Sequence, residues 1–260
     1  MTAVPFLLLQ LSDTHLGADW HGLDPDECLL RAVEAVLDLS QRPDALVVSG
    51  DLTQNGTPEE YQRVRELLAP LDLEPHVLPG NHDLRGPMRE AFGLPGEGAE
   101  HASHAVDLGP LRLVCLDSTI PGAEAGALDE GRIEWLDAAL GEEREKPTVL
   151  AMHHPPLSTA IPSFDAIGLA PEWRAALGEV LARHPQVTRI IAGHVHRVIA
   201  AELAGRAVLS IPSTYLQAKL EFAPAAIEMA PDPPGFAIHA LRDGALTSHV
   251  QTFPRFLSSE

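Results

Sequence analysis

Five short motifs in this chain combine aspartate, asparagine and histidine as metal sites and acid–base sites do. They contain seven strong donor side chains, namely Asp13, His15, Asp51, Asn81, His153, His194 and His196. Imidazole and oxygen donors without a thiolate suit Fe, Mn, Zn or Co. Seven donors are too many for one tetrahedral zinc ion, but they fit two ions that share a carboxylate. Two neighbouring metal ions stabilise in-line displacement at phosphorus, so the motifs predict phosphoester chemistry.

Each motif also has an ordinary structural interpretation when it is taken alone. Thirteen histidines among 260 residues give about 0.6 His-x-His pairs by composition, so His194-Val195-His196 says little by itself. A Gly-Asp or Gly-Asn pair fits a turn, Asp51 fits a helix cap, and His153 fits a buried core histidine. The occurrence of all five motifs in one chain is what favours a site.

The motifs follow apolar runs that read as buried strands. The expected strands are Phe6 to Leu11, Ala45 to Val48, His76 to Leu78, Leu111 to Leu116, Thr148 to Met152 and Val187 to Ala192. The expected helices between them are Asp26 to Ser40, Pro58 to Leu68, Glu130 to Leu140 and Pro171 to His184. Alternating strands and helices predict an α/β fold whose helices cover the sheets. The carboxyl ends of the strands then bring the five motifs to one edge.

Local sequence also marks one helix start and a different arrangement near the C-terminus. Thr57, Pro58 and Glu60 form the pattern of a helix cap with a capping box. Three expected strands without intervening helices predict an antiparallel region or a sheet edge, at Ala207 to Ile211, Phe236 to Leu241 and Ser248 to Phe253.

Composition limits the partners and the location of the protein. The 37 acidic and 18 basic residues give a formal charge of −19, which disfavours non-specific binding to nucleic acid or to anionic membranes. An anionic substrate therefore needs a local positive field, which bound metal ions supply. The apolar start MTAVPFLLLQLSD has no basic n-region, so we expect neither a signal peptide nor a membrane span, and a cytoplasmic location.

Length and cysteine content indicate one ordinary globular domain. A chain of 260 residues that is 45% hydrophobic supports a single domain over residues 1–260. Cys28 and Cys115 are too few and too far apart for a disulfide framework or a cysteine zinc site, so both are expected to be buried thiols. A homodimer or higher homo-oligomer is compatible with the sequence.

The five motifs resemble the five-block signature of the calcineurin-like metallophosphoesterase superfamily, from residue 13 to residue 196. The resemblance implies a four-layer α/β/β/α sandwich. Three finer segments are similar to the bacterial branch of class III cyclic-nucleotide phosphodiesterases and glycerophosphodiesterases. These segments are Leu46-Val47-Val48-Ser49-Gly50-Asp51, Pro58-Glu59-Glu60-Tyr61 and Met152-His153-His154-Pro155-Pro156.

The resemblance also implies a role for each site residue. Asp13, His15 and His196 would hold a first metal ion, and Asn81, His153 and His194 would hold a second, with Asp51 as the bridge. His153 is the family-like ligand because it precedes Pro155 by two residues, whereas His154 would either contact the ligands from behind or belong to the loop structure. Four residues would contact substrate, namely His15, Asn81, His82 and His196. His82 would stabilise phosphoryl oxygens or protonate the leaving alkoxide, with Asp83 as its orienting partner.

The implied reaction is hydrolysis of a small phosphodiester by in-line attack of a hydroxide held by two Fe, Mn, Zn or Co ions. A 3′,5′-cyclic nucleotide such as cyclic AMP is the first expectation, and a glycerophosphodiester or a phosphomonoester is the alternative. A non-catalytic metal-binding scaffold is the alternative of another class, although all seven donors and His82 are present. Substrate contacts are expected in the loops Ala18 to Leu23, Leu84 to Gly98, Leu157 to Ala170 and Thr214 to Phe222, where Trp20 or Tyr215 offers a ring for stacking or for packing.

Overall fold

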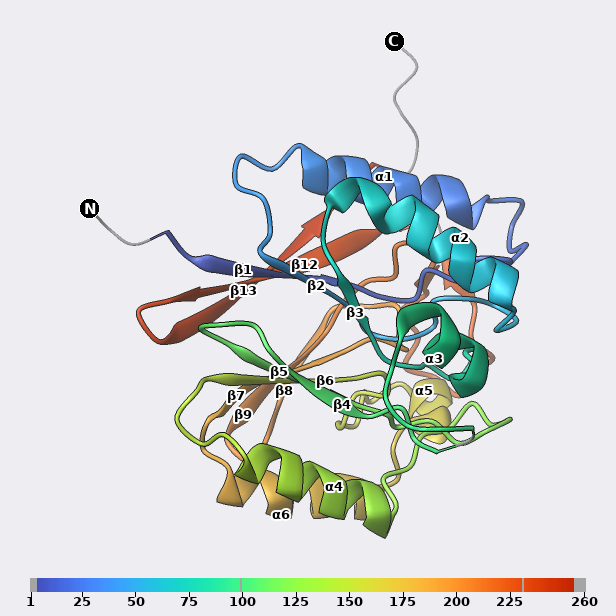
Figure 1. The fold of residues 1–260 in the computed structure, drawn as a ribbon. Coiled ribbons are helices and arrows are strands. Elements are labelled where there is room, and N and C mark those ends of the chain that lie inside the picture. The colour runs from blue at the N-terminus through green and yellow to red at the C-terminus, as the bar shows by residue number, and fades with distance from the viewer. Residues whose placement is uncertain (1–3, 99, 231, 255–260) are drawn as a thin grey trace.

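Two β-sheets pack face to face, and helices cover the outer face of each sheet in the computed structural model of the chain (Figure 1). The structure describes residues 4–98, 100–230 and 232–254. The remaining positions, including the first three residues of the apolar start and the ends of the expected 1–260 domain, lie outside the described residues. The order of layers is helix, sheet, sheet, helix, so the predicted α/β/β/α sandwich is confirmed.

The first sheet of the described chain has five strands in the order β13-β12-β1-β2-β3. Their bounds are β1 Phe6–Leu11, β2 Ala45–Val48, β3 Pro75–Val77, β12 Gly235–Arg242 and β13 Ala245–Thr252. Strands β1, β2 and β3 are parallel, whereas β12 runs antiparallel to β1 and pairs with β13. The elements between β1 and β4 are α1 Pro25–Leu37, α2 Pro58–Leu68, the 3₁₀ turn Ala69–Leu71 and α3 Arg85–Phe92. Helices α1 and α2 lie on the outer face of this sheet (Figure 1).

The second sheet has six strands within the described residues, in the order β4-β5-β6-β7-β9-β8. Their bounds are β4 His104–Asp107, β5 Arg112–Leu116, β6 Thr148–Met152, β7 Val187–Ala192, β8 Ile199–Leu203 and β9 Arg206–Ser210. Helices α4 (Glu130–Gly141) and α6 (Pro171–Arg183) cover its outer face (Figure 1). The short helix α5 (Pro162–Ile167) and the strand pair β10 (Gln217–Ala218) and β11 (Met229–Ala230) complete the described elements.

The apolar core is divided into three layers because both faces of the central strands are buried. Leu9 and Leu11 of β1 face α1 and α2, whereas Leu8 faces the second sheet. Leu113 and Val149 meet it from that sheet. Burial on both faces is why these strands are continuous apolar runs rather than alternating ones.

Several elements differ from the sequence-based expectation. Strands β4 and β8 were not predicted, because they lie at the edges of the second sheet and are only partly buried. Helix α3 was read as a loop because its first turn contains Gly86-Pro87. The antiparallel prediction for the C-terminal part is correct for β12 and β13, but β9 pairs in parallel with β7 as well as antiparallel with β8. The predicted capping box is present, since Glu60 N donates to Thr57 Oγ1 and Thr57 N donates to Glu60 Oε2.

Strands β1, β2, β6 and β7 bring four of the motifs to one edge of the sandwich. Strands β6 and β7 end directly before their motifs, and one serine separates β1 and β2 from theirs. The fifth motif follows β3 at the same edge. No helix among residues 4–98, 100–230 and 232–254 is long and apolar enough to cross a membrane.

Candidate metal centre

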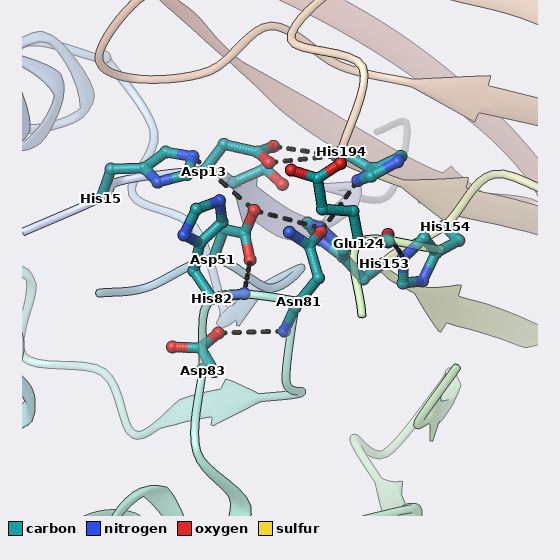
Figure 2. A network of polar contacts seen from close by, with 12 residues as sticks. Asp13, His15, Asp51, Asn81, His82, Asp83, Glu124, His153, His154 and His194 are labelled. Carbon is teal, nitrogen blue, oxygen red and sulfur yellow. Dashed lines mark hydrogen bonds and ion pairs between the residues drawn. The ribbon is translucent and has the colours of Figure 1, made fainter. Parts of the chain in front are cut away.

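The seven predicted donor side chains converge where the carboxyl ends of the two sheets meet, and Figure 2 labels all of them except His196. Asp13, His15 and His196 form one group. The Nε2 atoms of His15 and His196 lie 3.1 Å apart, and His196 Nε2 lies 3.3 Å from Asp13 Oδ1. All three side chains are buried. They are therefore suitable ligands for one ion.

Asp51, Asn81, His153 and His194 form the second group. Asn81 Oδ1 lies 3.2 Å from His153 Nε2 and 3.0 Å from His194 Nδ1, and Asp51 Oδ2 lies 3.3 Å from His153 Nε2. The same Asp51 oxygen lies 3.7 Å from His15 Nε2 in the first group. Asp51 thus stands between the groups, which is the position required of a bridging carboxylate.

Each of the four histidines has one ring nitrogen that faces the cluster and one that faces away from it. The nitrogen that faces away donates to a protein oxygen in each case, which bears on whether metal ions fit. His15 Nδ1 donates to Gln54 Oε1, His153 Nδ1 to the Ser49 carbonyl, His194 Nε2 to the Ile167 carbonyl and His196 Nδ1 to the Leu216 carbonyl. With the proton on the outer nitrogen, the inner nitrogen presents its lone pair to the cluster. Two inner nitrogens 3.1 Å apart need a proton or a metal ion between them, and the convergence of imidazole nitrogens with two carboxylates is a donor set that fits metal ions.

The backbone at five of these donor residues is held in an unusual conformation. Asp13, His15, Asp51, His194 and His196 have φ values of 54°, 48°, 50°, 68° and 46°. Positive φ is uncommon outside glycine, and it persists where the surrounding structure enforces it. Part of that enforcement comes from the ligands themselves, since His194 N donates to the Asp13 carboxylate and His82 N donates to Asp51 Oδ1.

Electrostatics keep the two carboxylates and His15 in their metal-binding forms. Burial favours the neutral form of Asp51, but the charge of His153 outweighs it and holds the pKa of Asp51 well below its ordinary value. His196 lowers the pKa of Asp13 against the same effect of burial. Burial lowers the pKa of His15 to about 3. Ionised carboxylates and a neutral imidazole are the states that bind metal. Against the effect of burial, Asp51 raises the pKa of His153 to about 9 and Asp13 raises the pKa of His196, so a metal ion binds these two imidazoles in exchange for a proton.

His82 lies beside the first group, and its half-buried ring is 4.9 Å from the His15 ring between centroids. Asp83 has other partners than the His82 ring. Its carboxylate accepts hydrogen bonds from the backbone of Leu52 and Gly80 and from the Tyr61 hydroxyl, and the structure records none between the Asp83 and His82 side chains. Burial, and then the charge of Asp51, raise the pKa of Asp83 to about 7. Asp83 thus braces the loop that carries Asn81 and His82.

His154 and Tyr215, which the sequence analysis singled out, have structural roles. His154 Nδ1 pairs with the Ser118 hydroxyl at 2.8 Å and its Nε2 donates to the Glu124 carbonyl, so both ring nitrogens are occupied, as expected for a loop support. Tyr215 is fully buried, and its hydroxyl accepts from Trp20 N and lies within hydrogen-bond distance of the carbonyls of Trp20 and Leu23, to which it donates its one proton. Tyr215 therefore cannot stack on a substrate, and it instead supports Trp20, whose ring stacks on it at 5.7 Å.

A pocket of about 120 Å³ opens onto the cluster beside Trp20. Its other walls include five residues that were not singled out from the sequence, namely Glu124, Phe164, Ile167, Ile227 and Met229. Phe164 and Ile167 fall in a loop expected to contact substrate. Glu124, Ile227 and Met229 come from segments without any motif, so only the folded chain reveals them.

Comparison with known proteins decides the family. The profile of the family described as calcineurin-like phosphoesterase matches residues 6–198, from β1 to just beyond the last motif. The chain belongs to the calcineurin-like phosphoesterase family. Members of this family use a two-metal centre, in agreement with the clusters described above. The phosphoesterase is thus a metal-dependent hydrolase of phosphoester bonds.

Individual relatives indicate which branch of the family the chain resembles. The phosphoesterase is 35% identical over 249 residues to the 3′,5′-cyclic adenosine monophosphate phosphodiesterase CpdA of Pseudomonas aeruginosa, with 93% of this chain and 88% of that protein covered. It is 33% identical over 219 residues to the glycerophosphodiester phosphodiesterase GpdQ of Enterobacter lignolyticus, with coverages of 81% and 78%. The predicted resemblance to this bacterial branch is confirmed.

Among solved structures, a dimetal phosphatase from Danio rerio has the same fold. Its TM-score is 0.70 at 16% identity, and 96% of each chain is covered. At this identity the likeness supports the fold of the phosphoesterase and not its substrate.

Proposed function

We propose that the chain hydrolyses a small phosphodiester, with 3′,5′-cyclic AMP or a related cyclic nucleotide as its first substrate. The observation that carries the proposal is the convergence of two donor groups on Asp51 beside the His82 ring. The relatives named as cyclic AMP and glycerophosphodiester phosphodiesterases support diester chemistry. We also propose that residues 1–260 form one phosphoesterase domain.

We assign one ion to Asp13, His15 and His196 and a second to Asn81, His153 and His194, with Asp51 shared. Fe, Mn, Zn and Co suit these nitrogen and oxygen donors. When bound, the two ions would polarise the phosphoryl oxygens and lower the pKa of a water molecule. Their positive charge also attracts an anionic substrate to a protein of net charge −19.

The other steps fall to the side chains of the protein. His82 faces the pocket together with Trp20 and donates a proton or a hydrogen bond to the leaving alkoxide. Asp83 acts through the backbone, because it holds Gly80 N and Leu52 N and so fixes the loops of Asn81 and Asp51. Asn81, His15 and His196 line the pocket that receives the phosphate.

Three alternatives remain distinct from this proposal. A glycerophosphodiester is the second candidate, favoured by the similarity to GpdQ. A phosphomonoester would present three terminal oxygens to the centre instead of two. A non-catalytic scaffold is disfavoured because the donor geometry and His82 are both intact.

A side-by-side kinetic series with saturating Mn²⁺ tests the proposal. We expect kcat/KM for 3′,5′-cyclic AMP or a glycerophosphodiester to exceed that of the matching monoesters by about tenfold, which is about 1.4 kcal/mol in transition-state binding. An Asp51→Asn variant should be inactive on every substrate and controls for contaminating phosphatases. Faster hydrolysis of monoesters than of every diester would overturn the assignment.

A further inference from the structure

A second cavity, of about 400 Å³, adjoins the metal centre at Asn81, which lines both spaces. The cavity lies between the start of α3 and the loop after β5, and its walls include Leu84, Gly86, Ile120 and Pro121. We call it the Leu84–Ile120 cavity. In Figure 2, Asn81 lies between His194 and Asp83, and Asp83 also lines this cavity.

The pocket at the centre is too small to hold a nucleotide. At about 120 Å³ it has room for about four water molecules, whereas pockets for ligands of drug size measure about 300–1,000 Å³. Another recess, bordered by Phe164 and Ile227, measures about 30 Å³ and is smaller still. An ester arm larger than a few atoms therefore has to extend into neighbouring space, and the Leu84–Ile120 cavity has the volume for it.

The polar groups at the cavity wall are already bonded within the protein. Arg85 Nε donates to Asp117 Oδ2 at 2.7 Å, and Arg85 Nη2 donates to the Thr119 carbonyl at 2.9 Å. The Asp83 carboxylate accepts from Leu52 N and from the Tyr61 hydroxyl among others. Because these groups are engaged with one another, the cavity offers a ligand mainly carbon atoms.

The mouth of the cavity carries two large apolar side chains that solvent reaches. Leu84 is 53% exposed and Ile120 is 37% exposed. A single exposed apolar residue is normal, but two on separate segments around one cavity indicate a surface that an apolar group covers. A hydroxyl-rich glycerol arm gains little binding free energy from such walls. A flat apolar ring is stabilised there because its apolar surface is removed from water.

We propose that the Leu84–Ile120 cavity binds the ester arm that stays on the phosphate of an acyclic diester and selects arms with an apolar ring, such as an aryl group, over glycerol. The inference rests on the proposed function. The retained arm is assigned here because His82, the proposed donor to the leaving alkoxide, lines the pocket beside Trp20 and does not line this cavity.

Two diesters with the same leaving group test the proposal, since the chemical step is then held constant. The probes are phenyl p-nitrophenyl phosphate and methyl p-nitrophenyl phosphate, assayed with Mn²⁺-loaded protein. We expect the wild-type kcat/KM to be about tenfold higher with the phenyl arm, mainly through KM. Leu84→Ser and Ile120→Ser should each lower that preference severalfold while leaving kcat/KM for the methyl arm within about twofold.

The control is Leu30→Ser, which changes a residue of α1 that is also 37% exposed and does not line the cavity. Serine is tolerated at position 84 because this residue is the N-cap of α3, where serine is favoured. Equal wild-type rates for the two arms, or a preference unchanged in both cavity variants, would overturn the inference but leave diester hydrolysis standing. If wild-type protein hydrolyses neither diester, the proposed function fails and the inference fails with it.

Discussion

The Nε2 atoms of His15 and His196 face each other at 3.1 Å, although 181 residues separate the two histidines in the chain. Both outer nitrogens donate to protein oxygens, so the inner nitrogens are the atoms that face the cluster. Two nitrogens at this distance repel each other unless a proton or a metal ion lies between them. The His15–His196 contact therefore marks the place where we expect the first metal ion to bind.

Metal content follows directly from the two donor groups. We expect two transition-metal ions per chain by elemental analysis of the purified protein. Asp51→Asn should weaken both sites by more than about tenfold, because Asp51 contacts both groups, whereas Asp13→Asn should weaken mainly the first. Asp107→Asn, at an exposed carboxylate far from the motifs, is the control. One ion per fully active wild-type chain would contradict the two-metal assignment.

His82 is expected to act on the reaction without holding metal. His82→Ala should keep both ions and lose about 10²–10⁴-fold in turnover of a diester with a poor leaving group. A nitrophenolate leaving group needs less protonation, so its loss should be smaller. His21→Ala, at an exposed histidine next to Trp20, should retain activity. Equal losses with both leaving groups would remove the acid role, and loss of metal would show that His82 is a ligand.

The glycines of two motifs are required by close packing. A Cβ atom at Gly80 would overlap Asp51, and one at Gly193 would overlap Ser12 Oγ and lie 2.6 Å from Asp13 Oδ2. Gly80→Ala and Gly193→Ala should therefore displace the carboxylates, reduce bound metal and lower the melting temperature. At Gly141 a Cβ meets nothing within 4 Å, so Gly141→Ala is the matched control. Full metal occupancy in Gly80→Ala would show that the loop can move aside at little cost.

A buried histidine outside the centre should make stability depend on pH. His239 Nε2 donates to Gln10 Oε1 at 3.0 Å, and its Nδ1 lies 2.7 Å from Ser248 Oγ. Burial, and then the charge of Arg189, lower its pKa from 6.5 to about 3. The unfolded chain therefore binds a proton below pH 6.5 that the folded chain does not. Stability from this group is full above pH 6.5 and is lost as the pH falls towards 3.

Urea unfolding at pH 7 and pH 5.5 measures this effect. Both proteins are compared at equal metal loading. From pH 7 to pH 5.5, the free energy of unfolding of the wild type should fall by about 1 kcal/mol more than that of His239→Gln. The other buried histidines contribute to both proteins and cancel in the difference. An identical pH dependence of the two proteins would mean that His239 also takes up its proton in the folded state.

The sequence by itself determined the chemistry of the donors and the strands that deliver them. Strands β1, β2, β6 and β7 have the bounds predicted from their apolar runs, because a strand buried on both faces is recognisable locally. The start of α2 was predicted for a similar reason, since the bonds between Thr57 and Glu60 span only three residues. The five motifs were sufficient to indicate the family and the two-metal centre.

Tertiary structure alone decided which groups meet and what surrounds them. The contact of His15 with His196 and the position of Asp51 between two groups depend on the packing of one sheet against the other. Edge strand β4 carries no continuous apolar run, and the Leu84–Ile120 cavity joins two segments about 35 residues apart, so neither leaves a local pattern. Residues that act through contacts distant in sequence become visible only when the chain is folded.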